Sequence, residues 1–505
     1  MRVLHPTLRR APDRLLRREK SAWATLSKGR PRRTSDNRIL KMQTESSEGA
    51  ARLGTMPRTT FGRLLLLLLL ALPVSIHAQY LFAYRIVDGS VTITGYNGLE
   101  YDVVVPDTLE GLPVTRIGSQ AFFLCSSLTK VAIPDGVTSI GSGAFQGCTG
   151  LTNVTIPETV TSIGYAAFWE CASLISLTIP ASVTSIGTDA LYGCDNLSAI
   201  EVDPLNPAYS SVDGVLFNKS PDTLMKFPGT KAGSYVIPNR VTNVDNLAFN
   251  GCSGLISITV PSSTTNLGNR PFLECARLAA IAVDELNPTY SSVDGVLFNK
   301  SLDTLIKYPQ DKPGSYIIPN SVTNVGNEAF LFCSGLTSVT IPDGVTNVGI
   351  SAFSQCTNLT AIEVDPLNPV YRSVDGVLFN KNLDTLTKYP AAKPGNYTIP
   401  ESVTKIRIQA FNGCTELTSV TIPNSVRNIE DATFGGCFAL TNVTLPNSVI
   451  GIGNGAFRDC TSLTSITIPS VLIIGNRAFQ GCTGLTGITL PRASIGDGAF
   501  EGCTA

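Results

Sequence analysis

The chain has 505 residues, of which 13 are cysteines and two are histidines. Both histidines, His5 and His77, precede residue 79, so the remaining chain cannot build a histidine-based nucleophilic triad or a histidine metal site. After residue 78, 22 basic and 34 acidic residues give a formal charge of −12, which argues against nucleic-acid binding because phosphates require a basic surface.

Two segments precede the main part of the chain. Residues 1–55 are rich in arginine and lack apolar periodicity, so we expect a basic leader outside the mature protein, either upstream of a true start at Met56 or as a disordered extension. Residues 56–78 combine a basic segment, seven consecutive leucines and small residues before Gln79, the order of a secretory signal peptide. The apolar run is shorter than the roughly 20 residues of a membrane span. We therefore predict a secreted or cell-surface protein whose mature chain begins at Gln79 and has no integral membrane span.

One pattern then repeats to the end of the chain. Its copy at residues 140–163 has the form Ile-Gly-x-x-Ala-Phe-x-x-Cys-x-x-Leu-x-x-Val-x-Ile-Pro-x-x-Val-x-x-Ile. Successive cysteines are 21 to 23 or 58 residues apart, and phenylalanine lies three residues before cysteine in twelve of thirteen copies, Leu191 being the exception. Such regularity predicts a repeat architecture.

Each repeat predicts one coil of a solenoid. Val154 and Ile156 alternate as a short strand with one buried face, and Pro157 ends it because proline donates no ladder hydrogen bond. A single coil cannot bury its own apolar face, so coils must stack. We predict a solenoid of the leucine-rich-repeat type with coils of about 23 residues and short parallel β-strands, β-rich with turns and short helical segments.

The three 58-residue gaps hold inserts. With one ordinary repeat, each gives an 81-residue super-repeat, and the inserts cover about residues 203–238, 284–319 and 365–400. Two strands are expected in the first insert, and turns around its Asn-Pro pair. The simplest architecture has wider or additional coils in the same stack.

Aromatic residues of the inserts are the candidate ligand contacts. If exposed, they would make the protein multivalent, whereas the commoner role is the core of the insert itself. These residues are Tyr209, Tyr290, Tyr371, Phe217, Phe298 and Phe379.

Repeated acidic and threonine residues allow a functional and a structural interpretation. Asp203 and Asp213, with their copies at 81-residue spacing, could bind calcium or act as glycosidase acids, but turn chemistry explains aspartate beside proline or glycine. Strand threonines such as Thr155 could contact ice or carbohydrate, but β-propensity explains them. We therefore assign no catalytic residue, no metal site and no cofactor.

The cysteines fall at one place on successive coils and predict a structural ladder. Free thiols acting as small apolar groups are favoured over disulfides, because parallel inward Cβ vectors suit a bridge poorly and thirteen is odd. The spacings also lack the close pairs of a zinc site. The ladder consists of Cys125, Cys148, Cys171, Cys194, Cys252, Cys275, Cys333, Cys356, Cys414, Cys437, Cys460, Cys482 and Cys503.

The repeat resembles that of the BspA-like leucine-rich repeat family almost letter for letter, from about residue 82 to the end. Residues 84–96 and 111–118 look like the N-terminal cap of that family, which gives a cap at 79–116 followed by repeats at 117–505. The Val-Asp-Gly-Val-Leu-Phe-Asn segment of the inserts is also similar. The resemblance implies a surface protein that binds host or matrix proteins, although a fold alone does not fix function.

We therefore expect a non-enzymatic interaction or adhesion protein that binds an extracellular protein or glycan through its repeat surface. Two alternatives stay open: a structural envelope element without a specific ligand, and a polysaccharide-active enzyme on a solenoid. The sequence stops two residues after Cys503 without a recognisable cap. We expect that the native sequence continues, or that the last coil docks on a partner or a second copy.

Overall fold

The computed structural model of the chain describes residues 81–220, 222–468, 470–490 and 492–504. All of them belong to one compact unit, residues 72–505. The expected leader at 1–55 and signal peptide at 56–78 lie outside the described residues. Within the described ranges, no helix has the length and apolar character needed to cross a membrane.

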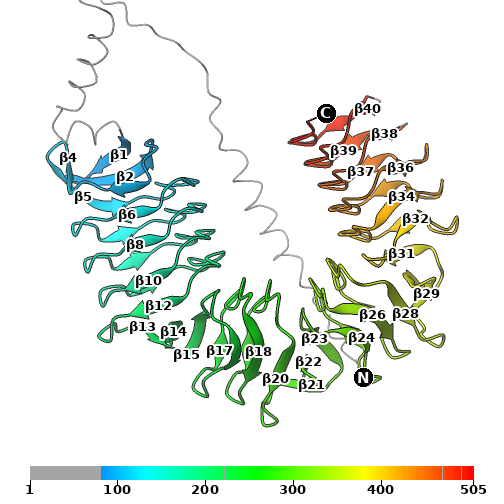
Figure 1. Cartoon of the computed structure of the whole chain (residues 1–505), viewed down its shortest axis with the longest axis horizontal. Coiled ribbons are helices and arrows are strands. Elements are labelled where there is room, and N and C mark those ends of the chain that lie inside the picture. Colours follow the sequence, from blue (N-terminus) through cyan, green and yellow to red (C-terminus); the bar gives the residue numbers. More distant parts are fainter. Residues whose placement is uncertain (1–80, 221, 469, 491, 505) are drawn as a thin grey trace, which may run out of the picture. The chain divides into compact units, whose positions relative to one another are not determined.

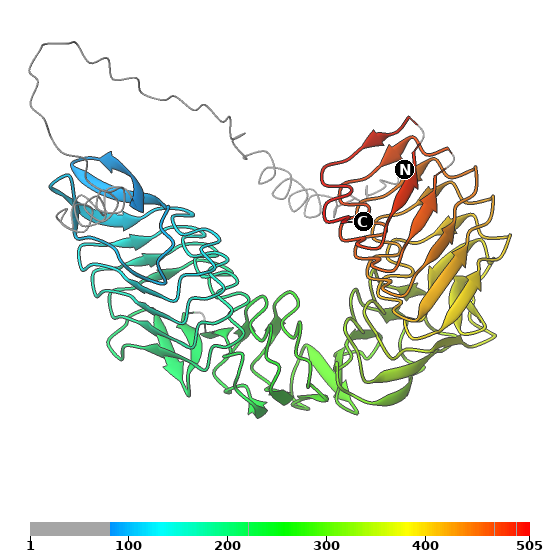
Figure 2. The same ribbon diagram turned by 45° about the horizontal axis from the view of Figure 1, so that its top comes forward.

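Short parallel strands stack in two columns along the chain, and this confirms the predicted solenoid (Figures 1 and 2). The first column contains the strands around the Val-x-Ile motif: β3 (Asp102–Val104), β6 (Lys130–Ala132), β8 (Asn153–Thr155), β10 (Ser176–Ile179), β12 (Ala199–Val202), β16 (Gly233–Val236), β18 (Leu255–Val260), β20 (Ala280–Val283), β24 (Gly314–Ile317), β26 (Leu336–Ile341), β28 (Ala361–Val364), β32 (Gly395–Thr398), β34 (Leu417–Thr421), β36 (Asn442–Thr444), β38 (Ser465–Thr467) and β40 (Gly487–Thr489).

The second column precedes the turn of each coil. Its strands are β5 (Leu112–Ile117), β7 (Ser139–Ile140), β9 (Ser162–Ile163), β11 (Ser185–Ile186), β15 (Asp222–Lys226), β17 (Asn243–Val244), β19 (Asn266–Leu267), β23 (Thr304–Lys307), β25 (Asn324–Val325), β27 (Asn347–Val348), β31 (Thr385–Lys388), β33 (Lys405–Ile406), β35 (Asn428–Ile429), β37 (Gly451–Ile452), β39 (Ile473–Ile474) and β41 (Ser494–Ile495).

A hairpin begins the described stack. Strands β1 (Phe82–Val87) and β2 (Ser90–Tyr96) pair antiparallel, and β2 pairs parallel with β5 of the second column. The two-residue strand β4 (Thr108–Leu109) pairs antiparallel with β5. The ring of Phe82 packs against Phe122 of the first coil, with centroids 6.3 Å apart. The hairpin thus joins the hydrophobic core of the repeats.

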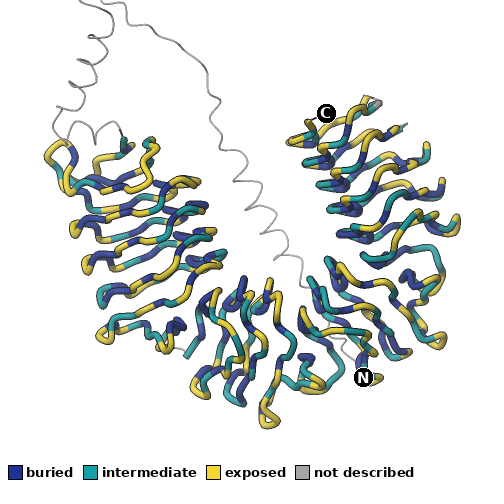
Figure 3. Tube along the Cα trace, in the orientation of Figure 1, coloured by how far each residue is buried: buried dark blue, intermediate teal, exposed yellow. Residues whose placement is uncertain are grey.

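The register between coils equals the period of the sequence. In the first column Val131 pairs with Val154, and in the second column Ile140 pairs with Ile163. In these coils each buried side chain therefore lies on its own counterpart 23 residues away. Buried and exposed segments alternate along every coil in the same order (Figure 3).

Turns replace the short helical segments that we expected, so that part of the fold prediction is wrong. Between residues 82 and 504, the described chain forms strands and turns without a helical element. In one turn Ala166 and Glu170 have φ angles of 52° and 57°. Two left-handed residues four positions apart exclude a right-handed helix there.

A column of aromatic rings forms the centre of the core. From Phe411 through Phe434, Phe457 and Phe479 to Phe500, successive ring centroids lie 4.8, 5.2, 5.2 and 5.3 Å apart. This spacing follows from the roughly 4.7–4.9 Å between paired strands. Burial of each such ring contributes about 1.5–3 kcal/mol, so the column is a main source of stability.

Cysteine thiols form a second column beside the rings. All thirteen cysteines are free, and eleven are buried. The thiol of Cys148 donates to the carbonyl oxygen of Phe122 at 3.0 Å, and that of Cys171 donates to Phe145 at 3.2 Å. Burial raises the pKa of Cys148 to about 12, which keeps the thiol protonated and able to donate. The ladder therefore consists of coil-to-coil hydrogen bonds as well as apolar contacts.

Each insert combines an antiparallel hairpin with one coil that lacks a cysteine. In the first insert, β15 returns the chain to the second column and β16 returns it to the first. Phe227 stacks on Phe249 with centroids 5.1 Å apart, so it takes the phenylalanine position of this insert coil. Tyr308 and Tyr389 take that position in the other two. The hairpin strands are β13 (Tyr209–Val212) and β14 (Val215–Lys219), β21 (Tyr290–Val293) and β22 (Val296–Asn299), and β29 (Tyr371–Val374) and β30 (Val377–Asn380).

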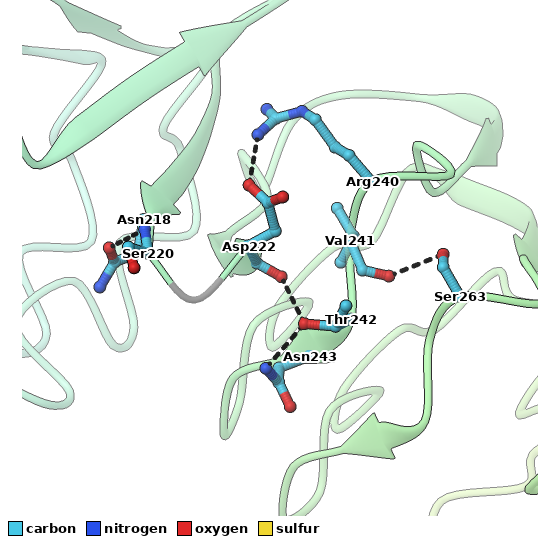
Figure 4. A network of polar contacts seen from close by, with 8 residues as sticks. All are labelled: Asn218, Ser220, Asp222, Arg240, Val241, Thr242, Asn243 and Ser263. Carbon is cyan, nitrogen blue, oxygen red and sulfur yellow. Dashed lines mark hydrogen bonds and ion pairs between the residues drawn. The ribbon is translucent and has the colours of Figure 1, made fainter.

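A polar network joins the first insert coil to the coil that follows (Figure 4). Arg240 donates from Nη1 to Asp222 Oδ1 at 3.2 Å, and its guanidinium lies 4.5 Å from the centroid of the Phe217 ring. The Thr242 hydroxyl donates to the Asp222 carbonyl oxygen at 3.3 Å. Since both ionic side chains are more than a third exposed, this pair orients the strands more than it stabilises them.

Phe434→Ala should lower the free energy of unfolding by about 3–5 kcal/mol, because the ring is fully buried between two others. The matched control is Thr444→Ser on the exposed face of the same coil, which should change stability by less than about 0.5 kcal/mol. Urea unfolding followed by circular dichroism measures both. Equal effects at the two positions would contradict the assigned interior.

All thirteen cysteines should react with iodoacetamide in denaturant without reductant, because each is a free thiol in the fold. Mass spectrometry of the intact protein should then count thirteen labels. Under native conditions labelling should be slow, since only Cys125 and Cys503 are partly exposed. Labels that appear only after reduction would show that the ladder is disulfide-bonded.

Candidate functional site

The predicted aromatic contacts lie inside the inserts. Phe217, Phe298 and Phe379 are fully buried, Tyr209 and Tyr371 are 5% and 7% exposed, and Tyr290 is half-buried. The Tyr209 hydroxyl accepts a hydrogen bond from the Ile186 amide at 2.8 Å, and the other two tyrosines accept equivalent bonds at 3.0 Å. These tyrosines fasten the hairpin to the preceding coil. Five of the six residues are buried in the core of the inserts, the commoner role, and offer no surface as exposed ligand contacts. Tyr290 is half-buried, and a contact role for it stays a prediction.

Three leucines at the start of the inserts are the most exposed large apolar residues there. Leu205, Leu286 and Leu367 occupy one register position and are 83%, 82% and 80% exposed. In the first copy, Asp203 Oδ1 accepts a hydrogen bond from the Leu205 amide at 2.7 Å. The buried Asn206 side chain donates to two carbonyl oxygens of the preceding coil at 2.7 and 2.8 Å. Each turn is fixed by these bonds, and we call the three residues the turn leucines.

The repeated aspartates have structural positions, as turn chemistry predicts. The Asp284 and Asp365 carboxylates accept the leucine amide as Asp203 does, at 2.8 Å in both copies. Asp213 and its two copies have φ angles of 50–51° beside a glycine at the tip of the insert hairpin. Neither set forms a pair of acids around a cleft. The described residues contain no group of three or more histidine, cysteine, aspartate or glutamate side chains able to hold a metal ion.

The turn of every insert coil is short, and this leaves a gap on its outer side. In an ordinary coil, Ile163 precedes Phe168 by five positions, whereas Leu224 precedes Phe227 by three in the first insert coil. The turns before and after the insert coil therefore face each other, and side chains 58 residues apart make contact. We call these gaps the first, second and third notch. They lie between residues 187–193 and 245–251, 268–274 and 326–332, and 349–355 and 407–413.

A lysine lines each notch: Lys226, Lys307 and Lys388. Its ammonium donates to carbonyl oxygens of the following turn, at 3.0 Å from Lys226 and Lys307 and at 3.1 and 3.2 Å from Lys388. Lys226 and Lys388 are buried, and burial lowers the pKa of Lys388. Since a buried ammonium is unfavourable without partners, the lysines hold the following turn by its carbonyl groups.

Side chains nearly fill the first and third notches, which enclose cavities of about 40 and 20 Å³. Asp189 and Asp245 line the first notch from opposite turns, and burial raises the pKa of both carboxyl groups. In the third notch, Gln409 Oε1 accepts hydrogen bonds from the hydroxyls of Ser351 and, at 3.2 Å, Ser354. Side-chain hydrogen bonds between the two turns therefore close the third notch, whereas the lining side chains nearly fill the first.

The second notch is open behind its rim. It encloses a cavity of about 380 Å³, and Tyr290 forms part of the wall. Arg270 spans the rim and donates to both carboxylate oxygens of Glu328, with 2.5 Å between Nε and Oε2. Gly326 occupies the position that Asp245 has in the first notch and Arg407 in the third. One notch of three therefore has the size and the mixed lining of a ligand site.

The sequence contains a signal for the notches that our interpretation missed. In each insert, lysine stands directly before the aromatic residue that enters the core, in the segments Leu-Met-Lys-Phe, Leu-Ile-Lys-Tyr and Leu-Thr-Lys-Tyr. A lysine is unusual at that position, because its side chain would enter the interior of an ordinary coil. It is accommodated only where the neighbouring turn is missing. The shortened distance from leucine to aromatic residue gives the same indication.

Solved structures of leucine-rich repeat proteins are similar to this chain. A leucine-rich cell surface protein from Faecalibacterium prausnitzii is 29% identical, with a TM-score of 0.44 and coverage of 72% of this chain and 92% of that one. A leucine-rich repeat protein from Bacteroides ovatus is 25% identical, with a TM-score of 0.32 and coverage of 84% and 91%. The pneumococcal vaccine antigen PcpA is 19% identical, with a TM-score of 0.36 and coverage of 82% and 91%.

No curated protein matches the chain. The family model described as "BspA type Leucine rich repeat region" matches with six copies, over residues 115–221, 224–310, 307–387 and 391–505. These ranges contain the thiol ladder and most of the ring column and of the three inserts, and residues 222–223 and 388–390 fall between them. The match extends over more than half of the sequence, and the chain therefore belongs to the BspA-type leucine-rich repeat family.

Proposed function

We propose that this chain is a secreted or cell-surface interaction protein that binds an extracellular protein through its repeat surface. The observation that carries the proposal is the set of turn leucines, Leu205, Leu286 and Leu367, each at least 80% exposed. Membership in a family of surface repeat proteins supports the location and the general role. The solenoid has an extended surface of the kind that other repeat proteins use for binding.

The turn leucines favour a protein as the ligand. A single exposed leucine is ordinary on any protein surface. Three at one register position, each on a turn fixed by a buried asparagine, are different because their geometry is set before binding. Pre-organised apolar contacts lose little conformational entropy on binding. Three linked contacts of the same kind also raise the overall affinity, because the first contact raises the effective concentration of the others.

Two other functions have less support. A structural envelope element without a specific ligand would not need exposed leucines at equivalent positions. A polysaccharide-active enzyme would need a pair of acids around a cleft, whereas the repeated aspartates bind amides in turns. We therefore regard the protein as non-enzymatic.

Binding should depend on all three turn leucines together. We suggest screening the chain against extracellular matrix proteins and glycans, followed by surface plasmon resonance with the bound component. Substituting Leu205, Leu286 and Leu367 together by serine should weaken binding more than tenfold, and a single substitution should weaken it less. The melting temperature should stay unchanged, because the side chains are exposed.

A matched control replaces three exposed isoleucines outside the inserts, Ile175, Ile350 and Ile450, by serine. The three isoleucines are 54%, 49% and 41% exposed and occupy different register positions, so this variant also removes exposed apolar area and should bind normally. Undiminished binding by the triple leucine variant would refute the proposed contact surface. A screen in which a glycan binds and no protein does would favour the glycan as ligand, and a screen without any binding would favour the envelope element.

A further inference from the structure

We propose that the cavity of the second notch binds a small amphipathic anion, a carboxylic acid with an aliphatic or aromatic body. The cavity has a volume of about 380 Å³, within the roughly 300–1,000 Å³ of small-molecule sites. Its two counterparts, with about 40 and 20 Å³, are too small for any such ligand. Of the three equivalent notches, the second alone has a cavity of this size. This site is separate from the turn leucines.

The cavity exists because the two turns beside it carry different side chains from their copies. Gly326 has no side chain where Asp245 and Arg407 project into the other notches. In the third notch, Arg407 Nη1 reaches the carbonyl oxygen of Val348 at 3.5 Å and so crosses the space. In the second notch, the ion pair of Arg270 and Glu328 joins the turns at the rim. The pair bridges the opening and leaves the space behind it unfilled.

The ring column is interrupted where the chain enters each insert, and at the second notch this interruption adjoins the cavity. The Tyr308 ring stacks on Phe330 with centroids 5.0 Å apart, and Phe272 packs on Phe249 at 5.6 Å. Within the described residues, no ring contact joins Phe272 to Tyr308, and none joins Phe353 to Tyr389 at the third insert, so the ring column has such a gap at the closed third notch as well. Apolar side chains around this gap form the cavity wall, and they include Leu267, Phe272, Leu297, Ile306 and Leu331. An apolar ligand body would restore the missing contacts of these side chains.

The polar part of the lining favours a negative charge. Arg270 and Lys307 are cationic, Glu328 is anionic, and Glu328 already pairs with Arg270. The described residues give the Lys307 ammonium one hydrogen bond, to the Leu331 carbonyl oxygen at 3.0 Å. An ammonium has three N–H groups, so donors remain for an oxyanion. By contrast, Lys388 donates to two carbonyl oxygens in the closed third notch.

The proposed pose follows from these two parts of the lining. The carboxylate of the ligand accepts hydrogen bonds from the Lys307 ammonium, and the apolar body lies between Phe272, Leu297 and Ile306. Tyr290 fixes one wall, because its hydroxyl accepts the Leu267 amide at 3.0 Å and cannot turn toward solvent without breaking that bond. A charge-assisted hydrogen bond inside an apolar wall discriminates strongly between an acid and its neutral analogue.

Calorimetric titration of the full chain with octanoate and 3-phenylpropionate tests the proposal. At least one of them should bind with one site per chain, and octanol and octylamine should bind at least tenfold more weakly. Binding of octanoate alone or of 3-phenylpropionate alone identifies the ligand body as aliphatic or aromatic. Lys307→Met, which keeps the volume of the side chain, should weaken acid binding at least tenfold and remove the preference over octanol.

Gly326→Arg should abolish binding, because it gives the second notch the residue that crosses the third. A Cβ atom at Gly326 would lie 2.9 Å from the Leu305 carbonyl oxygen, so circular dichroism must show that this variant is folded. Arg407→Gly, in the third notch, is the matched control and should bind normally. Failure of both acids to bind at millimolar concentration, equal binding of octanol, or full affinity in a folded Lys307→Met variant would overturn the proposal.

Discussion

Every coil of this protein depends on its neighbours, because about 23 residues cannot enclose their own apolar side chains. Coil-to-coil contact therefore determines which residues each position accepts. The ring, the thiol and the two strands must return at one register, as the pairing of Ile140 with Ile163 shows. An insert is tolerated only if it also supplies a coil. Phe227, Tyr308 and Tyr389 meet this requirement by packing on the ring of the coil that follows, where the insert coil has no cysteine.

On its inner side, each insert coil continues the packing of the stacked coils. On its outer side, the insert coil departs from the regular repeat. Their turns are two residues shorter, so the neighbouring turns meet across a notch rather than through regular backbone bonds. Residues in a notch are released from the repeat register, and their side chains differ among the three copies. Because of this freedom, side chains nearly fill two of the notches, and the other notch holds a cavity. The same inserts present the turn leucines, so repeat packing and surface function are separated within one segment.

Much of the fold could be predicted from the sequence, because buried positions recur in a fixed register. Ile140, Phe145, Cys148 and Leu151 all lie in the core, as the pattern indicates. The function of outward positions was harder to predict. For aromatic residues such as Phe217, a core role and an exposed contact role both stayed open, because the sequence does not state on which side the hairpin folds back. The notches also escaped prediction, since they depend on contacts between turns 58 residues apart. The prediction of short helical segments was wrong, because left-handed residues such as Glu170 cannot be recognised from composition.

The most direct test of this account is the thermal unfolding of two deletion variants. Removing residues 142–164 takes out one period of 23 residues and joins Gly141 to Tyr165, which restores the repeat pattern. Removing only residues 142–153 leaves an incomplete coil and breaks the register at that junction. Circular dichroism should show that the first variant keeps its β-structure and unfolds cooperatively near the temperature of the parent chain, whereas the second loses both properties. Equal behaviour of the two variants would contradict the claim that coil register holds the structure together.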